Sequence, residues 1–314
     1  MEYVALGRTG LSVSVASLGA GGHSRLGASG PDGEAGAARL VRAAIEAGVN
    51  LIDTAPAYGT EGVVGGGIAG VPRERVVLST KYSLYENKTR LKRPEEVEAS
   101  VRASLAALRT DYIDIYHLHG VSPADYPYAS QYLLPELVKL REKGVIRFLG
   151  ITEDFGRDTG HAMAAQALRD RCWDVMMVGF HLLNQSARER VFPTAIEQGV
   201  GILNMFAVRS ALSRPEKLAA IVADLVERGI VDGRAVDPER PLDFLVHPDG
   251  AKNVIDAAYR FCRYEPGVHS VLTGTGNPAH LAANLASLGR PPLPERDVRR
   301  ARGLFGGIDA VSGN

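Results

Sequence analysis

The stretch Asn50-Leu51-Ile52-Asp53-Thr54-Ala55-Pro56-Ala57-Tyr58-Gly59 sets the expectation for the fold of the whole chain. Its apolar first half is typical of a buried strand that stops at Asp53, and Tyr58 follows shortly afterwards. Two later strand-like stretches stop in the same way, 76–81 at Lys81 and 112–119 at His119. Ligands bind at the carboxyl ends of the strands in open α/β sheets and in (β/α)8 barrels. The sequence therefore predicts that these polar side chains meet at one face.

The composition is that of an ordinary globular protein. The 314 residues are 45% hydrophobic and 23% charged, and a barrel of about 250 residues with additions fits this length. Lys plus Arg and Asp plus Glu both number 36, so no net field favours nucleic acid or an acidic membrane as partner. Cys172 and Cys262 show no metal-like spacing, and the first residues resemble no leader peptide. We expect a cytoplasmic protein with a small-molecule substrate.

Strand-like and helix-like segments alternate along the chain. A hairpin is expected at 4–15, where it could plug one end of a barrel. The strands expected after it are 15–18, 50–53, 76–81, 112–119, 146–151, 173–178, 201–205 and 270–273. The expected helices are 35–47, 61–69, 94–108, 133–143, 159–170, 187–197, 216–228, 251–264, 278–288 and 294–304.

Eight successive strand-then-helix units imply parallel strands with right-handed crossovers, and this number favours closure into a barrel. Residues 229–250 are the one less regular insertion, rich in turn signals. No linker-like or low-complexity tract divides the chain. The expected fold is an α/β (β/α)8, or TIM, barrel with an N-terminal β-hairpin and an extra C-terminal helix, forming one domain over 1–314.

Motifs spread over nearly the whole length resemble those of the aldo-keto reductases. They are Leu6-Gly7-Arg8-Thr9-Gly10-Leu11, Asp53-Thr54-Ala55 with Tyr58-Gly59 and Glu61, Ser79-Thr80-Lys81, Asp111-Tyr112-Ile113-Asp114-Ile115-Tyr116 with His119, and the segment from Gly274 to Asn284. Each motif alone is weak, but four catalytic residue types in family order make a specific pattern. The resemblance implies an oxidoreductase that transfers hydride between NAD(P)(H) and a carbonyl or alcohol substrate, namely an aldehyde, a ketone or a sugar-type compound.

The resemblance also implies a role for each of the four residues. Tyr58 is the general acid and base, although a tyrosine with a pKa of about 10 is too weak an acid unless it is helped. Lys81 would stabilise the phenolate of Tyr58, and Asp53 would hold Lys81 and compensate its charge. His119 would donate a hydrogen bond that orients the substrate carbonyl.

The expected cofactor site departs in part from the family pattern. The turn Gly274-Thr275-Gly276 leads into a helix with Asn277 as N-cap, which suits a phosphate group. No Lys or Arg occurs between 271 and 284, where NADPH-preferring members usually carry one, and His280 is the one basic candidate there. Both NADP(H) and NAD(H) therefore stay open as cofactor. Asn284 matches the family's adenine contact.

The nicotinamide end departs as well. Thr152 and Glu153 stand where the family often has Ser-Asn, and either can hydrogen-bond a carboxamide. Met177 stands in place of a glutamine in strand six. Met205, followed by Phe206, stands in place of a stacking tyrosine, and either can pack on a ring. The loop from Arg209 to Arg214 could contact pyrophosphate or substrate.

Two other functions stay open from the sequence. A nicotinamide-binding regulatory protein with little turnover is one, although the four intact catalytic residue types argue against it. A metal-dependent barrel hydrolase is the other, because strand alternation places His117 on the face of His119 and such a pair can bind a metal. His181 is the one histidine placed to add a third ligand. The physiological substrate, the reaction direction and the oligomeric state are not indicated by the sequence.

Overall fold

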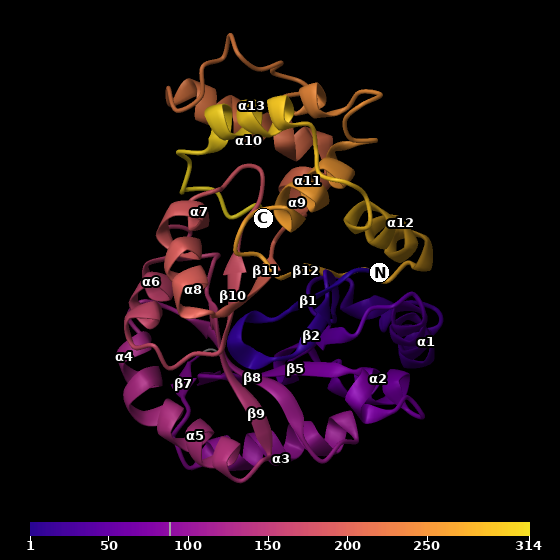
Figure 1. The fold of residues 1–314 in the computed structure, drawn as a ribbon, viewed down its shortest axis with the longest axis vertical. Coiled ribbons are helices and arrows are strands. Elements are labelled where there is room, and N and C mark those ends of the chain that lie inside the picture. The colour runs from indigo at the N-terminus through magenta and orange to yellow at the C-terminus, as the bar shows by residue number, and fades with distance from the viewer. Residues whose placement is uncertain (88) are drawn as a thin grey trace.

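Eight parallel strands close into a barrel in the computed structural model, which describes residues 1–87 and 89–314 (Figure 1). The strands follow one another round the barrel in chain order, as the expected (β/α)8 architecture requires. They are β3 (Ala16–Gly19), β4 (Leu51–Asp53), β5 (Val77–Ser83), β8 (Ile113–Val121), β9 (Ile146–Glu153), β10 (Val175–Gly179), β11 (Gly201–Met205) and β12 (Ser270–Thr273).

Helices cover the outside of this barrel. Figure 1 shows α1 to α8 arranged round the strands, α10 and α13 together at the upper end of the view, and α9, α11 and α12 below them, with α12 at the right. The helices are α1 (Gly33–Glu46), α2 (Glu61–Ile68), α3 (Glu96–Leu108), α4 (Tyr126–Tyr128), α5 (Leu134–Glu142), α6 (Ala162–Arg169), α7 (Ala187–Arg190), α8 (Phe192–Gln198), α9 (Ser210–Ser213), α10 (Pro215–Glu227), α11 (Val254–Arg263), α12 (Pro278–Leu288) and α13 (Glu295–Phe305). The helix α13 is the extra C-terminal helix that the sequence predicts, so the fold class is confirmed.

One expected helix is wrong in detail. The segment 187–197 forms two helices, α7 and α8, that break at Val191, whose φ and ψ are −126° and −54°. Pro193 lies in the first turn of α8, and its ring would clash with the carbonyl of Glu189 in a continuous helix. The short antiparallel pair β6 (Tyr85–Glu86) and β7 (Arg90–Leu91) was not expected from the sequence.

The N-terminal hairpin closes the amino end of the barrel. Its strands β1 (Tyr3–Ala5) and β2 (Ser12–Ser14) pair antiparallel. Leu6 and Val13 are buried and belong to one apolar cluster with residues from the beginnings of the barrel strands: Leu51, Val77, Ile115 and Val175. The expected plug is therefore confirmed, and the opposite, carboxyl end of the barrel is the end that can receive a ligand.

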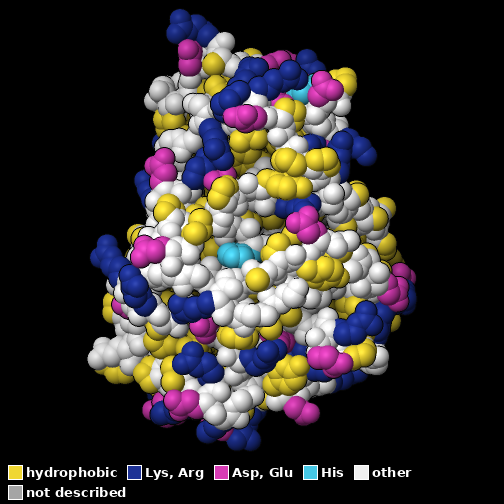
Figure 2. Space-filling view, viewed as in Figure 1, with side chains coloured by type: hydrophobic (Ala, Val, Ile, Leu, Met, Phe, Trp, Pro, Cys, Tyr) yellow, Lys and Arg dark blue, Asp and Glu magenta, His cyan; other side chains and the backbone are white. Residues whose placement is uncertain are grey.

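Charges of both signs share the surface. On the face drawn in Figure 2, basic and acidic side chains are interspersed, in line with the equal totals in the sequence. No helix in the described part of the chain combines the length and the apolar character needed to cross a membrane.

Candidate active site

Lys81 and Asp53 form a buried ion pair at the carboxyl ends of β5 and β4. The Nζ atom of Lys81 donates to Oδ1 and Oδ2 of Asp53 at 2.6 and 2.7 Å and to the carbonyl oxygen of Thr54 at 2.7 Å. The hydroxyl of Ser79 also donates to Asp53 Oδ1, at 2.7 Å. An ammonium group has three hydrogens to donate, so its charge and its hydrogen-bonding capacity are both compensated.

Tyr58 lies against this pair and against His119. A single 3-10 turn after β4 carries Tyr58 over the mouth, where its ring centroid lies 5.0 Å from Lys81 Nζ. Its hydroxyl lies 3.2 Å from Nε2 of His119, and the two rings meet edge to face at 86°. Ser83 lies 3.4 Å from the other ring nitrogen of His119. The structure thus brings together the four residues that the sequence predicts as catalytic.

Burial dominates the protonation of Tyr58 and His119. Burial raises the pKa of Tyr58, while the nearby charge of Lys81 lowers it and that of Asp53 raises it, so that the net shift is upward. Lys81 thus acts in the expected direction, but less strongly than burial. Burial, aided by the charge of Lys81, lowers the pKa of His119 to about 3. Near neutral pH the phenol of Tyr58 therefore carries its proton and His119 is uncharged.

The Lys81 ammonium keeps its proton in this environment. Burial lowers the pKa of Lys81. The charges of Asp53 and Tyr58 and the hydrogen bonds to them together raise this pKa by more than burial lowers it, so that it lies above the ordinary value. A permanently charged ammonium beside the Tyr58 ring can stabilise a phenolate that forms during proton transfer.

His117 lies deeper than His119 on the same strand. It is fully buried, pairs in register with Lys81, and neither of its ring nitrogens hydrogen-bonds to a described residue. Its ring packs on the backbone of Gly150, where a Cβ would lie 2.2 Å from Nδ1 of the histidine. Within the described residues, no group of three His, Cys, Asp or Glu side chains is placed to hold a metal ion. His181, the candidate third ligand, therefore does not complete a site with His117 and His119.

Thr152 and Glu153 end β9 and face opposite ways. The alternation of the strand puts Thr152 on the side of Phe148, which packs on the hairpin cluster inside the barrel. Its hydroxyl accepts a hydrogen bond from the N–H of Gly120 at 2.7 Å. The side chain of Glu153 is fully buried on the other side and is bound to Nδ1 of His161 at 3.0 Å. In this conformation Glu153 offers no exposed oxygen to a carboxamide, contrary to the expectation from the sequence.

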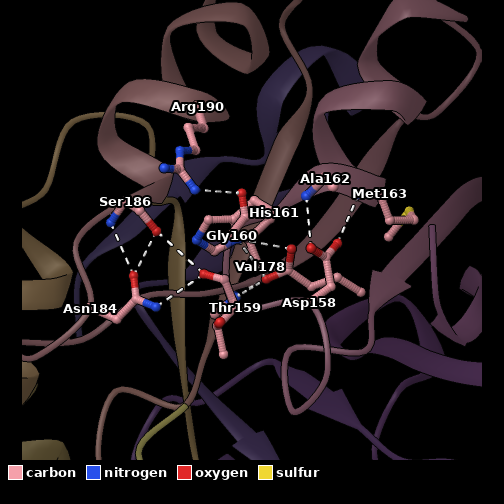
Figure 3. Close-up of polar contacts among 12 residues, drawn as sticks. Asp158, Thr159, Gly160, His161, Ala162, Met163, Val178, Asn184, Ser186 and Arg190 are labelled. Carbon is pink, nitrogen blue, oxygen red and sulfur yellow. Dashed lines mark hydrogen bonds and ion pairs between the residues drawn. The ribbon is translucent and has the colours of Figure 1, made fainter. Parts of the chain in front are cut away.

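The loop before α6 holds this buried carboxylate in place. In this loop His161 has a left-handed backbone conformation, with φ +63°. The carboxylate of Asp158 accepts hydrogen bonds from the N–H groups of Ala162 and Met163 at the start of α6, at 2.9 and 2.8 Å (Figure 3). The guanidinium of Arg190 donates to the carbonyl oxygen of Gly160 at 3.1 Å. Glu153 and its loop therefore form a supporting layer behind the mouth of the barrel.

The other residues predicted to contact the nicotinamide ring, Met177, Met205 and Phe206, lie at two depths in the barrel. Met177 is buried and belongs to the apolar cluster that the hairpin closes, so it forms part of the barrel interior. Met205 is partly buried at the end of β11. Phe206 follows it with φ +70°, a conformation that costs energy in a residue with a Cβ, and packs edge-on against Phe155 at 5.4 Å. Met205 and Phe206 are therefore the two that reach the mouth.

The turn after β12 keeps the geometry of a phosphate site. Asn277 caps α12 by accepting from the N–H groups of Ala279 and His280 at 2.8 and 3.4 Å. A Cβ on Gly276 would lie 2.6 Å from the backbone nitrogen of Gly27, so two glycines allow two loops to touch here. Asn284 is tied by its Nδ2 to Oγ1 of Thr273 at 2.9 Å. The two glycines therefore serve the contact between these loops, and the turn leads directly into the N-terminus of α12.

The comparisons with known proteins agree with this geometry. The model of the Aldo/keto reductase family matches residues 17–304. The chain belongs to this family. Among curated proteins it is 29% identical over 310 residues to the aldo-keto reductase YhdN of Bacillus subtilis, covering 90% of this chain and 87% of that one. It is 37% identical over 158 residues to L-galactose dehydrogenase of Arabidopsis thaliana, and this match spans 48% of each chain.

Solved structures of aldo-keto reductases share the architecture. A putative aldo-keto reductase from Pseudomonas aeruginosa is 28% identical with a TM-score of 0.67, covering 91% of this chain and 93% of that one. The holo form of AKR11C1 from Bacillus halodurans has a TM-score of 0.74 over the full length of both chains, and at 22% identity it supports the fold alone. The aldo/keto reductases are NAD(P)-dependent oxidoreductases, and this chain is an oxidoreductase of that family.

Two residues of this aldo/keto reductase gain a place that the sequence did not suggest. Gly21 packs on the ring of Tyr58, because a Cβ there would lie 2.7 Å from ring atom Cε2. Arg25 immediately precedes the Leu26–Gly27 segment whose backbone touches Gly276, so the loop that carries this basic residue lies against the phosphate turn. The sequence shows the glycines around Gly21 and the loop arginine Arg25, but it does not show which residues lie beside them in the fold.

Proposed function

We propose that this aldo/keto reductase reduces a carbonyl group of a small aldehyde, ketone or sugar-type substrate, with Tyr58 as the proton donor. The observation that carries the proposal is the hydroxyl of Tyr58, which lies beside Nε2 of His119 while its ring lies against the buried Lys81–Asp53 pair. A protonated phenol, a fixed cation and a neutral imidazole then converge where a carbonyl oxygen can bind.

In the reductive direction the carbonyl carbon accepts a hydride and the carbonyl oxygen accepts the proton of Tyr58. NAD(P)H, held at the turn after β12 and at the mouth of the barrel, would supply this hydride. Lys81 stabilises the phenolate that remains on Tyr58, and Asp53 holds Lys81 in position. His119 is uncharged and donates from Nε2 to the carbonyl oxygen, which fixes its orientation. In the oxidative direction Tyr58, as phenolate, is the base that takes the proton of the alcohol.

For the dinucleotide we propose a narrower set of contacts than the sequence suggests. The turn Gly274-Thr275-Gly276 and the beginning of α12 would bind phosphate, with His280 and Asn284 toward the adenosine end. Thr152 would bind the carboxamide, and Met205 with Phe206 would pack on the nicotinamide ring. Glu153 is left out because its carboxylate is already bound by His161 and by the N–H of Gly179, and Met177 because it packs in the apolar cluster that the hairpin closes.

Titration with NADPH and, separately, NADH, followed by cofactor fluorescence, tests the proposal together with turnover on a panel of aldehydes, ketones and sugars. We expect tight binding of at least one dinucleotide and carbonyl reduction that EDTA does not diminish. Failure to bind either dinucleotide would refute the proposal. Turnover that needs a metal and ignores the dinucleotide would instead favour a hydrolase, and binding without turnover a regulatory protein.

A further inference from the structure

The turn that carries Tyr58 has little packing of its own. Pro56, Ala57 and Gly59 are exposed to solvent, and Gly59 has a left-handed backbone conformation that suits glycine, with φ +69°. A short exposed turn that ends in a glycine is free to shift unless the residues on either side of it are held. The position of the Tyr58 hydroxyl therefore depends on the two flanks of the turn.

A hydrogen bond between side chains joins these two flanks. Oγ1 of Thr54 lies 2.9 Å from Oγ1 of Thr60, and both residues are buried. Thr60 is the N-cap residue of α2, where a threonine hydroxyl usually accepts from an N–H of the first helical turn, but within the described residues it makes no such bond. The hydroxyl of Thr60 therefore serves the turn and not the helix.

Both flanks are also attached to the strand that carries Lys81. On one side the carbonyl oxygen of Thr54 accepts from Nζ of Lys81 at 2.7 Å. On the other side Glu61, the first residue of α2, accepts from the hydroxyl of Thr80 at 2.6 Å, and both side chains are buried. Strand alternation turns Thr80 toward the helix layer, while its neighbour Lys81 faces the barrel interior. The Tyr58 turn is thus held to β5 at two adjacent residues.

Tyr58 lies between these attachments. Its ring centroid lies 5.0 Å from Nζ of Lys81, and its hydroxyl lies 3.2 Å from Nε2 of His119. A misplacement of about 1 Å can slow a catalysed step by about 10²-fold. Because the attachments end at Lys81 and at its neighbour, they control the separation of the phenol from the ammonium group.

We propose that Thr60 and Glu61 are positioning residues, which hold the hydroxyl of Tyr58 where it can give its proton to the substrate. They act through Thr54 and Thr80. The inference rests on the proposed function, in which Tyr58 is the proton donor. Loss of either side-chain hydrogen bond lets the turn move, which slows proton transfer and leaves substrate binding nearly unchanged.

Thr60→Val tests the inference, because valine keeps the branched shape of threonine but has no hydroxyl. Thr60→Ser restores the hydroxyl. Ser17→Ala is the matched control, since it breaks another buried pair of hydroxyls, that of Ser17 in β3 with Ser270 in β12. We expect Thr60→Val to lose about tenfold or more in kcat for carbonyl reduction, with KM within about twofold of the wild type. Thr60→Ser should keep most of the rate, and Ser17→Ala should lower the urea midpoint without lowering kcat.

Glu61 is tested in the same way. Glu61→Leu removes the acceptor of the Thr80 hydroxyl and should lower kcat as Thr60→Val does. Glu61→Gln keeps an acceptor oxygen and should keep most of the rate. A wild-type kcat in Glu61→Leu would overturn the role of Glu61.

The NMR signal of Tyr58 gives a readout that needs no turnover. Protein labelled with 13C at Cζ of tyrosine shows this signal, and Tyr58→Phe identifies it among those of the 11 tyrosines. We expect Thr60→Val to shift the signal, while Thr60→Ser and Ser17→Ala leave it in place. Such a shift in a protein that reduces no carbonyl compound would uphold the hold on Tyr58 while refuting the proposed function.

An unmoved Tyr58 signal in Thr60→Val would overturn the inference, whatever the rate, because the turn would not have moved. A shifted signal with wild-type kcat would overturn it as well, since the position of the turn would not matter for catalysis. An equal loss of kcat in Ser17→Ala would also overturn it, because the effect would then follow from lost stability alone.

Discussion

The ammonium group of Lys81 lies 2.6 and 2.7 Å from the two carboxylate oxygens of Asp53, and both side chains are shielded from water. A buried pair of this kind adds little net stability, but removal of one partner leaves an uncompensated charge in the interior. The pair therefore couples the stability of the barrel mouth to the charge beside Tyr58.

Replacement of Lys81 by Met should destabilise the protein by about 3–5 kcal/mol, because Asp53 keeps a buried charge or must bind a proton. Urea unfolding measures the change, and Lys81→Met combined with Asp53→Asn should recover part of the loss. A single variant as stable as the wild type would contradict the view that this pair is buried and mutually dependent.

Replacement of Gly21 by Ala should displace the ring of Tyr58, because the new Cβ would lie 2.7 Å from ring atom Cε2. We expect kcat to fall by about 10²-fold, the scale of a misplaced catalytic group, with nearly unchanged affinity for the cofactor. Gly62→Ala is the matched control, since a Cβ there meets nothing within 4 Å. Equal activity of the two variants would show that Gly21 does not position Tyr58.

The pH dependence of reduction follows from the two shifted groups. Reduction needs protonated Tyr58, whose pKa is raised above 10.0, so this form is lost only as the pH rises beyond that value. It also needs neutral His119, which is lost only as the pH falls toward about 3. We expect kcat/KM for carbonyl reduction to be flat between about pH 5 and 9. An inflection near the ordinary histidine value of 6.5 would contradict the burial of His119.

Arg25 should contribute to the choice of cofactor. Its loop touches Gly276 of the phosphate turn, and a guanidinium can grip the 2′-phosphate that distinguishes NADPH from NADH. We expect Arg25→Ala to weaken NADPH binding by about tenfold while NADH binding stays within experimental error. Arg39→Ala, on the nearby α1 and paired with Asp32, is the control. Equal weakening of both dinucleotides would contradict this role.

The fold and the four-residue cluster could be predicted because both depend on strand ends. Continuous apolar runs mark β4, β5 and β8, and parallel strands deliver Asp53, Lys81 and His119 to one face, although β5 continues to Ser83 and β8 to Val121. The break at Val191 is signalled in the sequence by Pro193, which cannot continue a helix across this point.

The supporting contacts could not be predicted because they join loops of no regular pattern. Glu153 finds His161 through an irregular loop, and its burial follows from that contact. Asn314 reaches Arg209 across 105 positions of the sequence. The loop of Arg25 lies against the phosphate turn because Gly27 and Gly276 touch. In each case one residue type is visible in the sequence, but its partner is determined by the path of a loop.

The central claim is that Tyr58 donates the proton, and Tyr58→Phe tests it most directly. The variant removes the hydroxyl and keeps the ring against Lys81 and Gly21. On a carbonyl compound that the wild type reduces, single-turnover oxidation of bound NAD(P)H should slow by about 10²–10⁴-fold, the range for loss of a general acid. The dissociation constant of the cofactor should stay within about twofold of the wild-type value, a change of less than half a kcal/mol. A variant that turns over at near wild-type rate would contradict the claim.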